Sequence, residues 1–129
     1  MVTWVALLIG GLLIPLSMIG FGRLFIKIAV SSEINMFFGY RTPMSTKNKE
    51  TWAFAHLYCG RLWWRVGLVM LPLTIVVMVI LLFFRRNENI VEILGAAAIG
   101  VQTLFLILPI IPTEIALRKN FDKQGNRRY

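Results

Sequence analysis

The sequence predicts an all-α membrane protein with three transmembrane helices and, between the first and second spans, an ordered interfacial loop and a short helix. The chain has 129 residues, and 57% of them are hydrophobic. Three uncharged runs, at residues 1–22, 66–84 and 93–113, each come close to the ~20 residues that a helix needs to cross the hydrocarbon core. Lipid offers no partner for backbone N–H and C=O groups, so such runs must be helices.

We expect one three-span domain over residues 1–129. The first apolar run has no basic segment before it and no small-residue cleavage site after it, which favours a retained span over a signal peptide. The domain divides into spans at about residues 3–28, 62–84 and 91–113, a polar loop at 31–60 and a basic tail at 114–129.

The first part of the polar loop, residues 35–44, carries signals for an ordered turn. Gly39 permits a positive φ, and the proline that follows Thr42 keeps that threonine out of helical conformation. Asn35 is a further turn-forming residue. Three aromatic side chains, including Tyr40, make the segment too apolar for a free loop. Aromatic rings favour the membrane interface, so the segment is expected to dock there or against the helix bundle.

Asn48 is well placed to cap the short helix that follows. Glu50 would then lie in the first turn, where a carboxylate meets the positive end of the helix. Trp52 continues this helix along the interface, and a bend at Gly60 is expected to lead into the second span. The arginines and tryptophans just after Gly60 mark the entry into lipid, where rings anchor and long basic side chains snorkel.

Arg41 is the strongest recognition group of the loop. Its planar guanidinium can bind a carboxylate or a phosphate through two hydrogen bonds, and the candidate partners within the chain are Glu33, Glu50 and Glu114. Glu114 needs a partner, because a carboxylate at the membrane edge is costly when unpaired. Two interpretations stay open: an ion pair that holds the loop to the bundle, or binding of a lipid phosphate or of an acidic group of a partner.

The distribution of basic residues predicts the orientation. Only Arg85 and Arg86 lie in the second loop, so the other twelve of the 14 lysines and arginines lie on the side of the first loop and the tail. Basic residues near span ends are retained in the cytoplasm. We therefore expect a multi-pass protein of the bacterial cell membrane with its N-terminus outside, and with the C-terminus and the 31–60 loop in the cytoplasm.

The net charge is +8, and the charged residues flank the spans. This distribution indicates membrane lipids as partners and no direct contact with nucleic acid. Cys59 and His56 are each the single residue of their type, which leaves no internal disulfide and no His/Cys metal cluster. The sequence contains no cofactor motif and no group of residues that would activate a catalytic nucleophile, so we expect that the protein is not an enzyme. The alternative is a membrane enzyme that uses His56 with Glu50 or Glu114 on lipid or peptide.

One pattern of residues covers nearly the whole chain: Asn35, Phe38, Gly39, Tyr40, Arg41, Thr42, Ser45, Asn48, Glu50, Trp52, the run from Pro109 to Glu114, Gly125 and Asn126. This pattern resembles the SdpI family of bacterial membrane proteins (SdpI/YfhL). The resemblance implies immunity, in which the cell is protected from a secreted, membrane-active peptide toxin. In the founding member, which has additional N-terminal spans, it also implies signalling, because the toxin-occupied protein holds a cytoplasmic repressor at the membrane.

A second interpretation is a lipid-binding or envelope-homeostasis protein. In that case Arg41 and the neighbouring basic residues would hold an anionic headgroup. Three spans form a modest bundle, so self-association is a further expectation.

Overall fold

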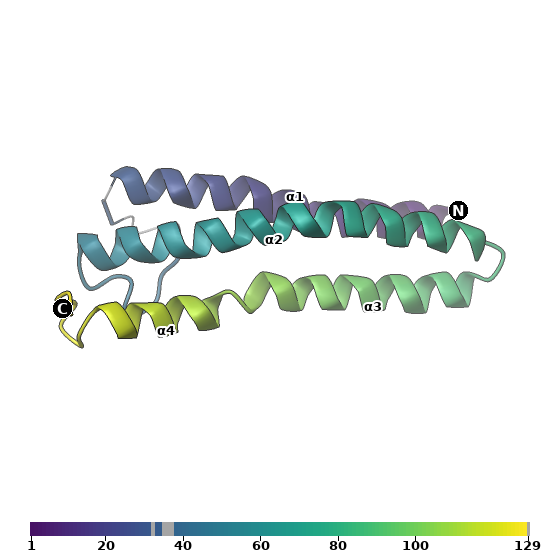
Figure 1. Cartoon of the computed structure of the whole chain (residues 1–129). Helices are drawn as coiled ribbons and strands as arrows, with labels where there is room; N and C mark the ends of the chain where they lie inside the picture. The colour runs from purple at the N-terminus through teal and green to yellow at the C-terminus, as the bar shows by residue number, and fades with distance from the viewer. Residues whose placement is uncertain (32, 35–37, 129) are drawn as a thin grey trace.

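The computed structural model describes residues 1–31, 33–34 and 38–128, and Asn35 lies outside this part of the chain. The helices lie side by side in an elongated bundle, with the two termini at opposite ends (Figure 1). Each span carries the chain across the membrane once, so an odd number of spans places the two termini on opposite sides. The helices are α1 (Val2–Ser31), α2 (Lys49–Phe83), α3 (Glu88–Ile107) and α4 (Ile110–Asn120).

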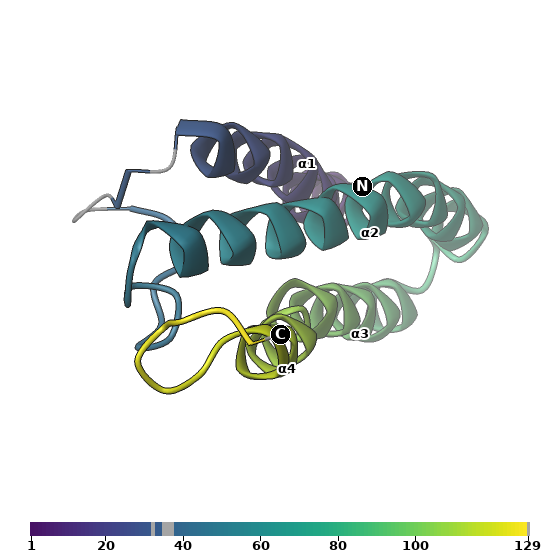
Figure 2. The same ribbon diagram turned by 60° about the vertical axis from the view of Figure 1, so that its left-hand side comes forward.

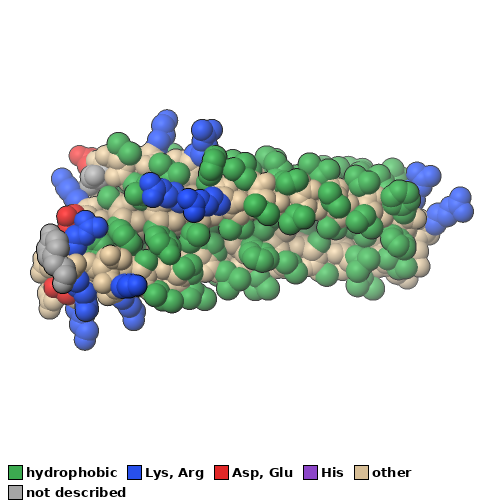
Figure 3. Space-filling view, viewed as in Figure 1, with side chains coloured by type: hydrophobic (Ala, Val, Ile, Leu, Met, Phe, Trp, Pro, Cys, Tyr) green, Lys and Arg blue, Asp and Glu red, His purple; other side chains and the backbone are tan. Residues whose placement is uncertain are grey.

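Three helical segments are long and apolar enough to cross a membrane: α1, α2 and the combined α3–α4 segment, Glu88–Asn120. The expected all-helical architecture with three membrane-spanning segments is therefore confirmed. Hydrophobic side chains cover the middle of the bundle, and basic side chains gather at its two ends (Figure 3). An apolar surface this large is typical of a protein whose solvent is lipid.

The short helix that we expected before the second span is not a separate element, because α2 runs without interruption from Lys49. Asn48 is its N-cap, as expected: its side-chain oxygen accepts from the Thr51 N–H at 2.9 Å, and the Thr51 hydroxyl oxygen accepts from the Asn48 N–H at 3.0 Å. This reciprocal pair satisfies two backbone donors that a helix start would otherwise leave unpaired. Glu50 lies in the first turn.

Gly60 brings α2 against α1. A Cβ at Gly60 would lie only 2.7 Å from the Gly22 carbonyl oxygen, and one at Gly22 would lie 2.8 Å from the Gly60 carbonyl oxygen. The two backbones therefore touch where neither residue has a side chain, which is how membrane helices achieve close packing. The expected bend at Gly60 stays a prediction; the structure shows that this glycine contacts α1.

The third span consists of two helices because Pro109 interrupts the hydrogen-bond ladder. Proline has no N–H and clashes with the preceding turn, so α3 ends before it. The Trp63 indole N–H donates to the Leu106 carbonyl at 3.0 Å and so pairs one of the carbonyls at this break. After the break, α4 continues to the basic tail.

Candidate functional site

Residues 38–48, which we call the loop cap, fold back over the first turns of α2. Tyr40 is its buried centre. The Tyr40 backbone N–H donates to His56 Nε2 at 2.9 Å, and the Tyr40 hydroxyl donates to Glu114 Oε1 at 2.7 Å. One residue of the loop cap therefore joins α2 to α4.

The protonation of His56 follows from these contacts. Since Nε2 accepts from Tyr40, the proton of the neutral ring lies on Nδ1, which is 2.8 Å from the Trp52 carbonyl oxygen and donates to it. His56 is fully buried, and its ring packs 4.1 Å from the centroid of the Trp52 ring. Both ring nitrogens are thus used in holding the loop cap, which leaves His56 no free nitrogen for acid–base catalysis.

Gly39 has the positive φ that its position in the sequence predicts, +121°. A Cβ there would lie 2.6 Å from His56 Nε2 and 3.1 Å from the Trp52 ring. A side chain would therefore displace the ring that receives the Tyr40 N–H. Gly39 serves both the backbone conformation and the close approach of the loop to α2.

Thr42 and Ser45 close the turn of the loop cap. The Thr42 N–H donates to the Ser45 hydroxyl oxygen at 2.8 Å, and that hydroxyl donates to the Tyr40 carbonyl at 2.9 Å. The Thr51 hydroxyl donates to the Ser45 carbonyl at 3.1 Å. Ser45 is fully buried and was absent from the predicted site, although it belongs to the motif. Short polar side chains of this kind replace backbone pairing in tight turns.

Glu114 accepts a hydrogen bond from the Tyr40 hydroxyl, a partner that the sequence analysis did not name. Burial, followed by the neighbouring Glu114 carboxylate, raises the pKa of Tyr40 well above its usual range, so its hydroxyl stays protonated and donates. Arg41 is exposed, and its guanidinium lies 6.0 Å from the centroid of the Trp52 ring. This cation–π contact places Arg41 on the outer surface of the loop cap, above its aromatic core.

The tail takes part in the same cluster, which sequence reasoning did not anticipate. Asn48 caps α2 with its oxygen and donates with Nδ2 to the Gly125 carbonyl at 2.7 Å. Phe121 is buried and packs edge-on against Phe54 of α2 at 5.5 Å between centroids. The loop cap and the tail therefore lie together at the end of the bundle opposite the N-terminus (Figure 2).

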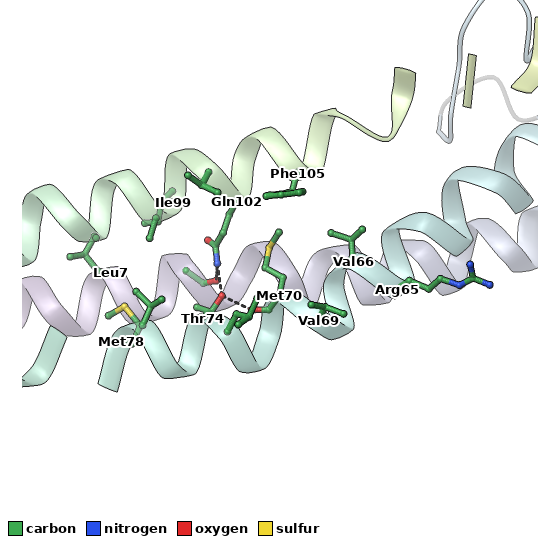
Figure 4. Close-up of a pocket in the computed structure, with 16 residues that line it drawn as sticks. Leu7, Arg65, Val66, Val69, Met70, Thr74, Met78, Ile99, Gln102 and Phe105 are labelled. Atoms are coloured by element: carbon green, nitrogen blue, oxygen red, sulfur yellow. Dashed lines mark hydrogen bonds between the residues drawn. The ribbon is translucent and has the colours of Figure 1, made fainter. Parts of the chain in front are cut away.

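A second feature lies in the middle of the bundle, where an apolar cleft of about 520 Å³ opens between α1, α2 and α3 (Figure 4). Its walls are almost entirely aliphatic, with Arg65 at one end. Gln102 of α3 points across it toward Thr74 of α2. The principal lining residues are Leu7, Gly11, Val69, Met70, Leu73, Thr74, Ala98, Ile99, Gln102 and Phe105.

Gln102 joins the three helices beside this cleft. Its Nε2 donates to the Gly11 carbonyl at 2.9 Å and to the Thr74 hydroxyl oxygen at 2.6 Å, while the Thr74 hydroxyl donates to the Met70 carbonyl at 2.8 Å. Turning the amide over would set two oxygens against each other at Gly11, so this orientation is the stable one. Within the described part of the chain, Gln102 Oε1 is buried and accepts no hydrogen bond.

Fold and site together define a multi-pass helical membrane protein with a capped end and an intramembrane cleft. Residues 31–113 match the family model of the SdpI/YfhL protein family, and the chain belongs to this family. The match includes all the described residues of the loop cap, α2 and most of the third span. No curated protein and no solved structure matches the chain. Among residues 1–31, 33–34 and 38–128, no group of three or more potential metal ligands lies together.

Proposed function

We propose that this protein is a membrane-embedded immunity protein that protects a bacterial cell from a secreted, membrane-active peptide toxin. Membership of the SdpI/YfhL family supports an immunity-type membrane protein. Such a role needs no catalysis; it needs a helical bundle that engages an apolar peptide within the bilayer. The observation that carries the proposal is the intramembrane cleft between α1, α2 and α3.

The cleft suits an apolar peptide. Its volume of about 520 Å³ falls within the roughly 300–1,000 Å³ of ligand sites, and its aliphatic walls favour apolar side chains. A buried acceptor without a partner costs about 1–3 kcal/mol. Gln102 Oε1 is enclosed in the helix packing beside the cleft, so a hydroxyl or N–H group of the toxin would remove this cost only where the helices part to admit it.

The proposed orientation has the N-terminus outside and the loop cap and tail in the cytoplasm. It rests on the concentration of basic residues around the first loop and the tail, against only Arg85 and Arg86 at the other end. A toxin that enters the bilayer would then reach the cleft from the lipid. The loop cap would be the surface available to a cytoplasmic repressor, in the signalling role that the family resemblance implies.

Expression of this chain in a toxin-sensitive bacterium is expected to raise survival under at least one member of a panel of secreted, membrane-active peptide toxins. Ala98→Trp is expected to abolish that protection, because Ala98 lines the cleft and the indole would fill it. Ala97→Trp is the matched control, since Ala97 is exposed and absent from the cleft lining. Immunoblots of membrane fractions check that the variants are present in equal amounts.

The two possible failures are distinct. If the unmodified chain protects against no toxin of the panel, the immunity function is wrong. If it protects and Ala98→Trp protects equally well, immunity stands and the cleft is not the toxin site.

A further inference from the structure

The tail and the loop cap enclose a basic pocket that the immunity function does not use. It has a volume of about 370 Å³ and lies between the loop before α2, the end of α4 and the tail. Four of its side chains are cationic, and one is a carboxylate. The lining residues are Met44, Lys47, Arg118, Phe121, Asp122, Lys123 and Arg128.

The carboxylate in this pocket is engaged in the fold of the tail. Asp122 Oδ1 accepts the backbone N–H of Gln124 at 2.9 Å and that of Asn126 at 2.8 Å. The carboxylate keeps its single negative charge, which the four cationic side chains outnumber. The pocket therefore keeps an excess of positive charge.

Hydrogen bonds of the tail fix the shape of one wall of the pocket. The Arg128 backbone N–H donates to the Asn120 carbonyl at 2.8 Å, and Arg128 Nε donates to the Phe121 carbonyl at 3.1 Å. Gly125, with a φ of +87°, lies under Asn48, which ties the tail to the start of α2. Of the four cations, Arg128 is thus held by a side-chain hydrogen bond of its own, which lowers the entropic cost of presenting its guanidinium to an anion.

The position of the pocket identifies the source of the anion. Ile111, Ile115 and Arg118 are spaced i, i+4 and i+7 on α4, so they lie on one helix face. The two isoleucines are 57% and 61% exposed, which makes this face the lipid-contacting one. Along it, apolar surface ends within one turn of Arg118. The pocket thus lies at the level where acyl chains give way to headgroups.

We propose that this basic pocket binds the phosphate of an anionic phospholipid headgroup, with the acyl chains along Ile111 and Ile115. A phosphate offers several acceptor oxygens, and Lys47 and Arg118 reach it from opposite elements. The site is separate from Arg41 of the loop cap, whose guanidinium lies over the Trp52 ring of α2. Bound lipid would connect the loop before α2 to α4 and the tail.

The test uses the full-length protein in detergent micelles, titrated with phosphatidylglycerol or with phosphatidylcholine of the same acyl chains, with bound lipid counted by native mass spectrometry. Phosphatidylglycerol is expected to bind and phosphatidylcholine not. Lys47→Gln combined with Arg118→Gln is expected to weaken phosphatidylglycerol binding by about tenfold or more, since each juxtamembrane cation attracts the headgroup. Both side chains are exposed and make no hydrogen bond within the described residues, so the variant should keep its fold.

Arg85→Gln combined with Arg86→Gln removes the same charge at the other end of the bundle and should leave phosphatidylglycerol binding within about twofold of the unmodified protein. Equal weakening in the two double variants would show general charge attraction and overturn the pocket. A loss confined to Arg41→Gln would move the site to the loop cap and also overturn it. Displacement of phosphatidylglycerol by low-millimolar inorganic phosphate would show that the pocket binds a soluble anion, and it would overturn the proposal of a lipid site.

Discussion

Tyr40 shows how a single residue organises the capped end of the bundle. Its N–H is bound by His56, its carbonyl by Ser45 and its hydroxyl by Glu114. Arg41, next along the chain, is the residue that charge alone singles out. The buried contacts belong to Tyr40 because its ring can be enclosed while its hydroxyl reaches a carboxylate at the rim of the bundle.

Tyr40→Phe should therefore destabilise the protein. It removes a hydrogen bond to a charged acceptor and leaves the Glu114 carboxylate without that donor, at a cost of about 1.5–3 kcal/mol. Thermal unfolding in detergent measures the loss. Tyr58→Phe removes the same atom from a partly exposed tyrosine whose hydroxyl makes no hydrogen bond within the described residues, and it should change the unfolding temperature little. Equal effects in the two variants would contradict a special role for the Tyr40 hydroxyl.

The raised pKa of Tyr40 predicts a loss of stability in alkaline solution. An unfolded tyrosine ionises near pH ~10, whereas burial and the Glu114 carboxylate keep Tyr40 protonated in the folded protein. The stability that this group contributes is therefore complete below about pH 10 and falls as the pH rises further. Comparing unfolding between pH 8 and pH 11 should show a smaller alkaline loss in Tyr40→Phe than in the unmodified protein. A parallel decline in both would count against the assignment.

Among the helices, the contact between α1 and α2 depends on glycines that face each other. Gly22 and Gly60 allow the two backbones to touch, and Gly67 brings α2 within van der Waals reach of the Pro15 carbonyl. The sequences of α1 and α2 do not predict which glycines face the neighbouring helix, because a long apolar run has no polar face that would orient the helix. Packing of the two helices decides this, and it also determines the width of the cleft beside them.

Gly60→Ala is expected to cost about 1–3 kcal/mol, since the new methyl group would meet the Gly22 carbonyl oxygen at 2.7 Å and the Phe25 Cβ at 2.9 Å. Gly20→Ala is the control on α1, because a Cβ there meets nothing within 4 Å. That change should be neutral, or should stabilise the helix by up to about 1 kcal/mol. Unfolding in detergent compares the two. A Gly60→Ala protein as stable as the unmodified chain would show that α1 and α2 separate easily.

At the scale of the whole molecule, charge separates the two ends of the bundle. The end that holds the loop cap and the tail carries most of the lysines and arginines, and the other end has only Arg85 and Arg86 near the turn between α2 and α3 (Figure 3). The positive-inside rule acts on such asymmetry during insertion. The same basic end contains the proposed headgroup pocket, so orientation and lipid contact would have a common electrostatic cause.

Cysteine labelling tests the orientation. In a Cys59→Ala background, which removes the single buried thiol, Lys123→Cys introduces a thiol in the tail and Asn89→Cys one in the first turn of α3. A membrane-impermeant maleimide added to intact cells should label Asn89→Cys and leave Lys123→Cys unlabelled until the cells are opened. Labelling of Lys123→Cys in intact cells would reverse the proposed topology.

The sequence by itself determined the membrane class, the three spans, the cap at Asn48 and the positive φ of Gly39. Each of these depends on neighbouring residues only: apolar run length, an N-cap side chain, or the absence of a Cβ. The tertiary structure alone decided which side chains meet. Tyr40 binds Glu114 across 74 positions, and Gln102 joins Gly11 across 91 positions and Thr74 across 28. Such pairings depend on the rotation and spacing of whole helices, which in lipid are set by packing between backbones rather than by any periodic signal in the chain.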